Sequence, residues 1–420
     1  MLPVGHEPWQ TNAFSSIPRL KLPVANANPT NTFPSRLYLS LDMKATSGLI
    51  IIPPSQMVIG RPSNIDRWYT EAIPSQLATS TLAGYNFLRN QLPGVPMQYR
   101  KLGSSDLNVS VVGLGTNNFG ARITDHAESS RVVHAGMELG MNLIDTAIGY
   151  GGGESEVHVG AATKDRRDPV IIATKFRAEV PEGKTFAQHL YDQCEISLGR
   201  LQTDHIDLYQ LHWPVFSLSA DEILEPLNKL VEQGKVRHYG VCNYSAWRLA
   251  ETNAVADSKS LPEMVSAQNN YNIMSRQVEI DLFPYCEQRN VGFLPYSPLG
   301  GGYLTGKYEA GKPAPEGTRG VGNGGEVGRL RNDRNEAMLA PLGAIAGEYG
   351  HSMLDMAFAW MLAHPEVASV IAGAMTPAQI EGNITAAEWQ LTPEQLEGIN
   401  AIADYEAGGI RGPERQAGRA

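Results

Sequence analysis

The chain has 420 residues, of which 42% are hydrophobic and 19% are charged. That composition supplies a large buried core and excludes a wholly disordered or collagen-like chain. The formal net charge of −10 gives no reason to expect general attraction to nucleic acid or to an anionic membrane surface. An apolar stretch at residues 48–52 ends at two prolines, far short of the roughly 20 residues that cross a bilayer, so no membrane span is expected.

The first 96 residues differ in composition from the rest of the chain. Prolines recur throughout them, charges are few, and no period of 2 or 3.6 persists. Arg19, Lys21 and Arg36 in a segment poor in acidic residues are a transit-peptide feature, but no amphipathic Arg-rich helix accompanies them. We expect residues 1–96 to be an irregular, dispensable extension and residues 97–420 to form one domain.

A short hairpin is expected at the start of this domain, with strands over residues 98–102 and 107–110. The turn between them is Gly103-Ser104-Ser105-Asp106. The hairpin precedes the first strand of the repeating pattern described next, so we expect it to cover the floor of the domain.

Short β-branched apolar runs then alternate with longer segments of helical period, which is typical of βα units around a parallel sheet. The expected strands span residues 111–116, 142–147, 170–175, 206–212, 238–243, 265–269, 291–296 and 368–373. The expected helices span residues 127–139, 155–163, 185–201, 220–233, 246–256, 277–288 and 333–363, the last broken at Gly350. Eight such units predict an α/β fold, a (β/α)₈ or TIM barrel.

Polar residues close six of the eight expected strands, where barrel enzymes place their reacting groups. They are Asp145, Lys175, His212, Asn243, Gln268 with Asn269, and Tyr296 with Ser297. Each one alone is equally well explained as a cap of the following helix. The set as a whole favours a catalytic site.

Four of these side chains, counting Tyr150 on the loop after the second strand, suit proton donation to a carbonyl. An ammonium beside a tyrosine favours its phenolate, so Lys175 is expected to lower the pKa of Tyr150 toward the operating pH. Asp145 would hold the lysine cationic, and His212 would hydrogen-bond the substrate oxygen.

The sequence resembles the aldo-keto reductase family from Met97 to about Tyr405. The matching segments are 113–116, 142–150 continuing into 153–156, 173–175, 208–212, 240–245, 296–300, 302–308 and 371–383. The resemblance implies an NAD(P)H-dependent reductase of aldehydes or ketones whose catalytic tetrad is Asp145, Tyr150, Lys175 and His212.

The resemblance also implies cofactor contacts. Asn243 and Gln268 would bind the nicotinamide carboxamide, and Tyr296 would stack on its ring, whereas Cys242 stands where the family often has serine. The remaining implied contacts are Gly115 and Thr116 at the end of the first strand, Ser297, Leu299, Gly301, Lys307 and Arg319 at the pyrophosphate, and Gly373, Met375, Gln379 and Asn383 at the adenosine. Residues 317–328 are expected to be mobile, as a lid or as a solvated linker.

The choice between NADP(H) and NAD(H) is left open by the residues at the adenosine end. Relatives place Lys or Arg here to bind a 2′-phosphate, but this chain has Gly373, Met375, Gln379 and Gly382, which makes NADH use reasonable. No G-x-G-x-x-G occurs at residues 113–118, so a Rossmann domain is not expected.

The remaining chemistry-bearing residues have simpler explanations. Cys194, Cys242 and Cys286 show neither disulfide nor zinc-ligand spacing, so no metal is expected and a reducing cytoplasm fits. The aromatic residues Trp213, Phe216, Tyr244 and Trp247 follow two strands and either line a substrate pocket or serve packing.

Three functions are compatible with these observations. The first is reduction of a small-molecule aldehyde or ketone. The second is an NAD-dependent sugar dehydrogenase that runs the same hydride transfer in reverse. The third is a cofactor-binding regulatory subunit similar to the channel β subunits of the family. The sequence does not indicate the oligomeric state.

Overall fold

The computed structural model describes residues 96–403, except 319 and 322–324. The extension predicted over residues 1–96 lies outside this range apart from Pro96, and so does the end of the predicted domain after residue 403.

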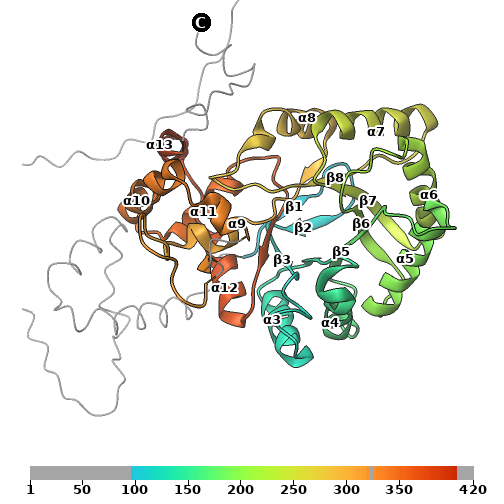
Figure 1. The fold of residues 1–420 in the computed structure, drawn as a ribbon, viewed down its shortest axis with the longest axis horizontal. Helices are drawn as coiled ribbons and strands as arrows, with labels where there is room; N and C mark the ends of the chain where they lie inside the picture. Colours follow the sequence, from blue (N-terminus) through green and yellow to red (C-terminus); the bar gives the residue numbers. More distant parts are fainter. Residues whose placement is uncertain (1–95, 319, 322–324, 404–420) are drawn as a thin grey trace, which may run out of the picture. The chain divides into compact units, whose positions relative to one another are not determined.

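Eight parallel strands follow one another around a barrel in chain order (Figure 1). The last strand pairs with the first, and each of the first seven strands then pairs with the next in chain order, apart from the seventh. The parallel bridges Phe293–Val367 and Tyr296–Ile371 join the two ends of the sheet and close the barrel. The described chain is therefore a (β/α)₈ barrel, as predicted. The strands are β3 (Val112–Gly115), β4 (Leu143–Asp145), β5 (Ile171–Phe176), β6 (Ile206–Leu211), β7 (Val236–Cys242), β8 (Ser266–Gln268), β9 (Gly292–Phe293) and β10 (Val370–Gly373).

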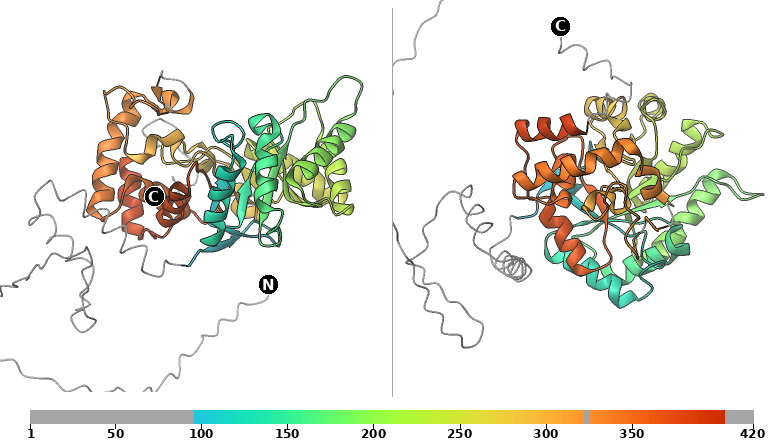
Figure 2. Two further views of the ribbon diagram at one scale, coloured as in Figure 1. Left: turned by 90° about the horizontal axis from the view of Figure 1, so that it is seen from below. Right: turned by 60° about the vertical axis from the view of Figure 1, so that its left-hand side comes forward.

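Helices surround the strands on the outside of the barrel, as the right-hand view of Figure 2 shows. Side-chain caps fix several of their first turns; Asp125, for example, accepts from the Ala127 N–H at the start of α3. The helices are α3 (His126–Glu138), α4 (Glu154–Thr163), α5 (Phe186–Leu201), α6 (Ala220–Glu232), α7 (Ala246–Lys259), α8 (Leu282–Arg289), α9 (Gly325–Leu330), α10 (Asp333–Glu348), α11 (Met353–Leu362), α12 (Pro377–Ala386) and α13 (Pro393–Ile402), with 3₁₀ turns η3 (Tyr150–Gly153), η4 (Gln277–Glu279) and η5 (Gly300–Thr305).

Two predicted segments differ from the structure. The helix expected over 277–288 is divided into η4 and α8, and the division leaves Pro284 in the first turn of α8, where its missing N–H is not needed. In the segment 317–328, expected to be mobile, the last residues belong to α9, whose Val327 and Leu330 are buried. The break predicted at Gly350 is confirmed, since that glycine has a φ of 74° between α10 and α11.

The predicted hairpin forms and closes the floor of the barrel. Its strands β1 (Tyr99–Lys101) and β2 (Asn108–Ser110) pair antiparallel. A Cβ at Gly103, whose φ is 55°, would lie 2.5 Å from the carbonyl oxygen of Val265 just before β8, so only glycine fits against the strand ends. Asp106 accepts hydrogen bonds from the Arg237 and His238 side chains at the start of β7.

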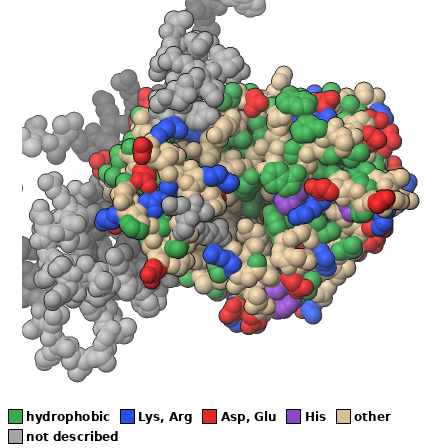
Figure 3. All heavy atoms as spheres, in the orientation of Figure 1, with side chains coloured by type: hydrophobic (Ala, Val, Ile, Leu, Met, Phe, Trp, Pro, Cys, Tyr) green, Lys and Arg blue, Asp and Glu red, His purple; other side chains and the backbone are tan. Residues whose placement is uncertain are grey.

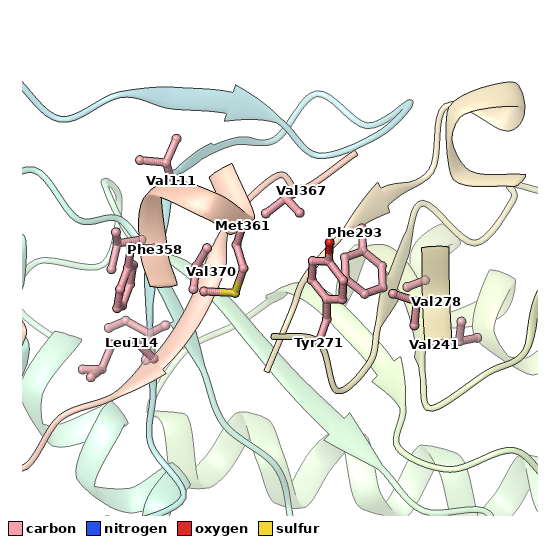
Figure 4. Close-up of a cluster of buried hydrophobic side chains, with 14 of the residues drawn as sticks. Val111, Leu114, Val241, Tyr271, Val278, Phe293, Phe358, Met361, Val367 and Val370 are labelled. Atoms are coloured by element: carbon pink, nitrogen blue, oxygen red, sulfur yellow. The ribbon is translucent and has the colours of Figure 1, made fainter. Parts of the chain in front are cut away.

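The hydrophobic core has two parts. The larger lies between the strands and the helices, and Figure 4 shows a portion of it in which the rings of Tyr271 and Phe293 meet edge to face, with centroids 5.9 Å apart. The smaller lies inside the barrel and contains Leu102 and Val109 of the hairpin together with Leu208 of β6. Because the hairpin and these apolar side chains fill the lower barrel, the polar strand ends are gathered at the opposite end.

Candidate active site

A buried ion pair lies at the carboxyl ends of β4 and β5. Lys175 is completely buried, and its Nζ lies 2.7 Å from Asp145 Oδ2 and 2.8 Å from the Thr146 carbonyl oxygen. Burial by itself lowers the pKa of Lys175, but the charges of Asp145 and Tyr150 and the hydrogen bond to Asp145 outweigh it and raise the pKa above its usual value. The ammonium is therefore a permanent cation in this site.

Tyr150 stands beside this cation at the start of η3. Its hydroxyl oxygen lies 3.4 Å from Lys175 Nζ, and the same Nζ is 4.9 Å from the centre of the tyrosine ring. The chain turns sharply after it, since Gly151, Gly152 and Gly153 all have positive φ. The 3₁₀ turn therefore directs the phenol back over the end of the barrel.

The expected direction of the Tyr150 pKa shift is wrong. Burial raises the pKa of this phenol, and the nearby Lys175 opposes that shift without reversing it. Desolvation disfavours the phenolate more than the single ammonium favours it. Tyr150 consequently keeps its proton at neutral pH, which is the state that a proton donor requires.

His212 follows β6 and presents a neutral imidazole to the tyrosine. The two rings lie edge to face with centroids 5.6 Å apart. Burial, with smaller contributions from Lys175 and Arg177, lowers the pKa of His212 to about 3. Among the described residues its Nδ1 is buried without a hydrogen-bond partner. The structure thus brings together all four side chains that were predicted as a tetrad.

A cavity of about 570 Å³ opens directly beside this tetrad. Asp145 and Tyr150 form part of its wall, whereas Lys175 is hidden behind them. Figure 3 shows a hollow near the middle of the face seen there, bordered by hydrophobic and basic side chains. Twelve predicted cofactor residues line the cavity: Gly115, Thr116, Gln268, Tyr296, Ser297, Leu299, Gly301, Lys307, Gly373, Met375, Gln379 and Asn383.

The comparisons with known proteins agree with this geometry. The model of the aldo/keto reductase family matches residues 111–404. The chain belongs to this family. It is therefore an oxidoreductase of the kind that acts on carbonyl groups.

Individual members of the family align along most of their own length. The Aldo-keto reductase YhdN of Bacillus subtilis (strain 168) is 32% identical over 331 residues, which cover 76% of this chain and 98% of that protein. A probable voltage-gated potassium channel subunit beta of Oryza sativa subsp. japonica is 31% identical, covering 73% and 96%. Norsolorinic acid reductase B of Dothistroma septosporum is 30% identical, covering 74% and 83%.

Linked polar side chains occupy the part of the site where the nicotinamide was expected. Gln268 Nε2 donates to Asp145 Oδ1 at 2.8 Å, which ties the expected carboxamide ligand to the tetrad. Asn243 does not line the cavity; its Oδ1 accepts from the Tyr296 hydroxyl at 2.7 Å, and its Nδ2 donates to the His212 carbonyl oxygen. Burial raises the pKa of Cys242 to about 12, so this residue is a neutral thiol.

The segment after β9 suits a pyrophosphate. Ser297, Gly301 and Gly302 have positive φ, and a Cβ at Gly302 would lie 2.8 Å from Lys307 Nζ. The absence of a side chain thus lets this cation approach the backbone. Ser297 Oγ donates to Glu326 Oε2 at 2.8 Å. A phosphate oxygen would have to replace that carboxylate as the acceptor of the Ser297 hydroxyl. Arg319, the remaining predicted contact, lies outside the described residues.

The adenosine end fits as well, and it contains a buried amide without a partner. Thr376 caps α12, and Gln379 Oε1 accepts from the Met375 N–H at 2.8 Å. Asn383 is 5% exposed and lines the cavity, and its Nδ2 makes no hydrogen bond to any described residue. Buried amides are normally hydrogen-bonded, so the unpaired Nδ2 is explained if a polar group of a bound ligand accepts a hydrogen bond from it. The residues therefore fit a nicotinamide dinucleotide.

Part of the cavity wall was not predicted from the sequence. Asn117, Asn118 and Arg122 also line the cavity, and Arg122 adds a cation that was not considered. They lie on the loop between β3 and α3, and loops after barrel strands carry binding residues, so their position was the available signal.

The four aromatic residues after β6 and β7 are not among the residues that line the cavity, so the expectation that they line a substrate pocket stays a prediction. Tyr244 is buried and serves packing. Trp213, Phe216 and Trp247 are 54%, 70% and 59% exposed, and the rings of Phe216 and Trp247 stack with centroids 6.2 Å apart. Trp213 also stacks on His212 at 6.0 Å, which places an exposed apolar surface next to the tetrad.

Within residues 96–403, apart from the four undescribed positions, no helix has the length and apolar character needed to cross a bilayer.

Proposed function

We propose that this protein reduces an aldehyde or ketone to an alcohol with NADPH or NADH, and that Tyr150 is the general acid. The observation that carries the proposal is the placement of the Tyr150 phenol on the cavity wall, with Lys175 Nζ 3.4 Å behind its oxygen. The bound dinucleotide would supply the hydride that reaches the carbonyl carbon.

The tetrad residues would handle the proton and the developing negative charge on the substrate oxygen. Tyr150 would donate its proton to that oxygen, and Lys175 would stabilise the phenolate left behind. Asp145 holds the ammonium through the 2.7 Å contact. His212, neutral because burial lowers its pKa, would orient the oxygen by a hydrogen bond rather than by charge.

Gln268 and Tyr296 would hold the nicotinamide, and Asn243 would position Tyr296 through its hydrogen bond rather than touch the cofactor, contrary to the contact expected for it. The segment from Ser297 to Lys307 would hold the pyrophosphate. Asn383 and Gln379 would meet the adenosine. Met375 carries no charge, so a 2′-phosphate would depend on Lys307, on Arg122 or on Arg319. We therefore keep both cofactors in the proposal.

The exposed surface of Trp213, Phe216 and Trp247 favours substrates with an apolar or flat portion next to the carbonyl, because such groups pack well on aromatic rings. All three cysteines are buried free thiols, which supports a reducing compartment such as the cytoplasm.

Two other activities remain to be separated from this one by experiment. Sugar dehydrogenation would use the same tetrad in reverse. A regulatory role has a specific observation in its favour, since one of the relatives is named as a channel β subunit. The intact tetrad favours turnover over a purely regulatory role.

The test is a rate assay with the purified full chain. NADPH and NADH are each supplied with a panel of aliphatic and aromatic aldehydes and ketones, and NADP⁺ and NAD⁺ with a panel of aldoses. Carbonyl-dependent cofactor oxidation faster than aldose-dependent reduction supports the proposal. Preferential aldose oxidation would establish the dehydrogenase instead, and cofactor binding without turnover on either panel would favour the regulatory role.

A further inference from the structure

A second cluster of chemistry-bearing side chains lies outside the catalytic cavity, where α3 and α4 begin. These helices lie side by side (Figure 1). His126 is the first residue of α3, Glu154 is the first residue of α4, and His158 lies one turn further along α4. One ligand atom from each of the three lies within 4.8 Å of the other two.

The spacing of the two residues on α4 suits joint ligation. Glu154 and His158 are four positions apart, so they share one face of the helix. His126 approaches from the neighbouring helix, and its ring stacks on that of His158 with centroids 3.9 Å apart. Zn²⁺ bound by imidazole and carboxylate at about 2.0–2.1 Å needs ligand atoms about 3.4 Å apart in a tetrahedron. In the structure the ligand atoms lie within 4.8 Å of one another, so metal binding requires them to move closer, and the exposed His126 and Glu154 side chains would supply that movement.

The hydrogen bonds of His158 leave one nitrogen ready to bind a metal. Ser129 Oγ donates to the His126 carbonyl oxygen at 3.0 Å, so it accepts from His158 Nδ1–H at 2.9 Å. This fixes the tautomer in which Nε2 carries the lone pair, the arrangement that supports metal-bound histidines. His158 is only 1% exposed, yet its Nε2 has no hydrogen bond within the part of the chain that the structure describes.

The other two side chains are similarly uncommitted. Among the described residues, neither the Glu154 carboxylate nor the His126 ring takes part in a side-chain hydrogen bond or an ion pair. The cation-binding groups of the cluster are therefore not used by the fold itself.

We propose that His126, Glu154 and His158 form a binding site for a divalent transition-metal ion, with Zn²⁺ as the natural fit to two imidazoles and one carboxylate, and with water in the fourth position. The ion would join the first turn of α3 to the first turn of α4. Glu154 follows η3 directly, so the ion would also fix the end of the turn that carries Tyr150. This proposal goes against the expectation of no metal site, and it does not depend on the proposed reductase activity.

The experiment uses the full chain without an affinity tag, because a histidine tag binds the same ions. The protein is stripped with a chelator and titrated with Zn²⁺ against a chromophoric competitor, and its melting temperature is followed with increasing Zn²⁺. We expect one Zn²⁺ per chain and a melting temperature that rises with metal concentration.

Variants assign the binding to the three residues. His126→Ala and Glu154→Gln change exposed side chains and are each expected to weaken Zn²⁺ binding by more than about a hundredfold. Ser129→Ala removes the hydroxyl that supports His158 and bonds the His126 carbonyl oxygen, and it should weaken binding by about 10–100-fold. His189→Ala on α5 is the matched control and should bind Zn²⁺ like the native chain. Circular dichroism of each stripped protein verifies the fold.

Either of two results would overturn the site. One is a native chain that binds no Zn²⁺ more tightly than the competitor. The other is a set of correctly folded His126→Ala and Glu154→Gln variants whose Zn²⁺ affinity equals that of the His189→Ala control.

Discussion

Lys175 Nζ lies 3.4 Å from the Tyr150 hydroxyl oxygen, and Tyr150 lines the cavity whereas Lys175 does not. The ammonium is completely buried and paired with Asp145. This single contact couples the charge state of one residue to the proton held by the other.

Removing the Lys175 ammonium should therefore slow the reaction by impairing proton donation from Tyr150. Lys175→Met is expected to lower kcat for carbonyl reduction by at least about a hundredfold, because the phenolate formed on proton donation loses its neighbouring cation. Lys184→Met, which removes an exposed lysine on the segment between β5 and α5, is the control. In a double-mutant cycle, Lys175→Met should cost much less once Tyr150 is already phenylalanine. Effects that simply multiply would show that the two residues do not act as a unit.

The pH dependence of reduction follows from the same groups. A proton donor loses activity as pH rises through its pKa, and burial raises that of Tyr150 above the usual value of about 10. His212 has its pKa lowered to about 3 and stays neutral above that pH. We expect kcat under saturating cofactor and substrate to be level through the neutral range and to fall only at alkaline pH. An inflection near pH 6–7 would contradict the assignment of a neutral His212.

The choice of cofactor should respond to one substitution. Met375 lines the cavity where the proposed cofactor would place its adenosine, and it carries no charge. Met375→Arg is expected to raise the NADPH-to-NADH ratio of kcat/KM by about 10–100-fold, the effect of one hydrogen bond to a charged group. Met375→Gln, polar but uncharged, should change the ratio much less. An unchanged ratio in the arginine variant would mean that the 2′-hydroxyl lies elsewhere in the cavity.

The boundary of the catalytic domain is open to a truncation test. A chain beginning at Met97 is expected to be as active as the full chain, since the residues before it lack the periodic pattern of a packed core. A chain beginning at Val112 loses the hairpin, in which Leu102 and Val109 are fully buried and Arg100 donates to the Val367 carbonyl oxygen at 2.6 Å. Its free energy of unfolding, measured by denaturant titration, should be lower by about 3 kcal/mol or more. Loss of activity on truncation at Met97 would show that the preceding segment contributes to the fold.

Much of this site was predictable because the carboxyl ends of all the strands of a (β/α)₈ barrel lie at one end of the barrel. Asp145, Lys175 and Gln268 each occur at or next to the end of a run of apolar residues, and parallel strands bring such ends to one rim. The sign of the Tyr150 pKa shift was not predictable in the same way. It depends on how deeply the phenol is buried, and that follows from packing around η3 rather than from the presence of a lysine.

The cluster on α3 and α4 was missed for a related reason. His126 and His158 are far apart in sequence, and zinc-ligand motifs are recognised in a sequence by close spacings of cysteine and histidine. Only the packing of two neighbouring helices places them together. Pro284, by contrast, was a readable signal that the helix expected over 277–288 begins later.

The central claim is that Tyr150 donates the proton during NAD(P)H-dependent carbonyl reduction, and the most direct measurement is single-turnover reduction by Tyr150→Phe with pre-bound cofactor. The aromatic ring is retained, so cofactor affinity should match the native chain, and the exposed Tyr349→Phe serves as the control. We expect the rate of hydride transfer to fall by about 10²–10⁴-fold, the usual contribution of a positioned acid. A Tyr150→Phe variant that transfers hydride at close to the native rate would contradict the assignment.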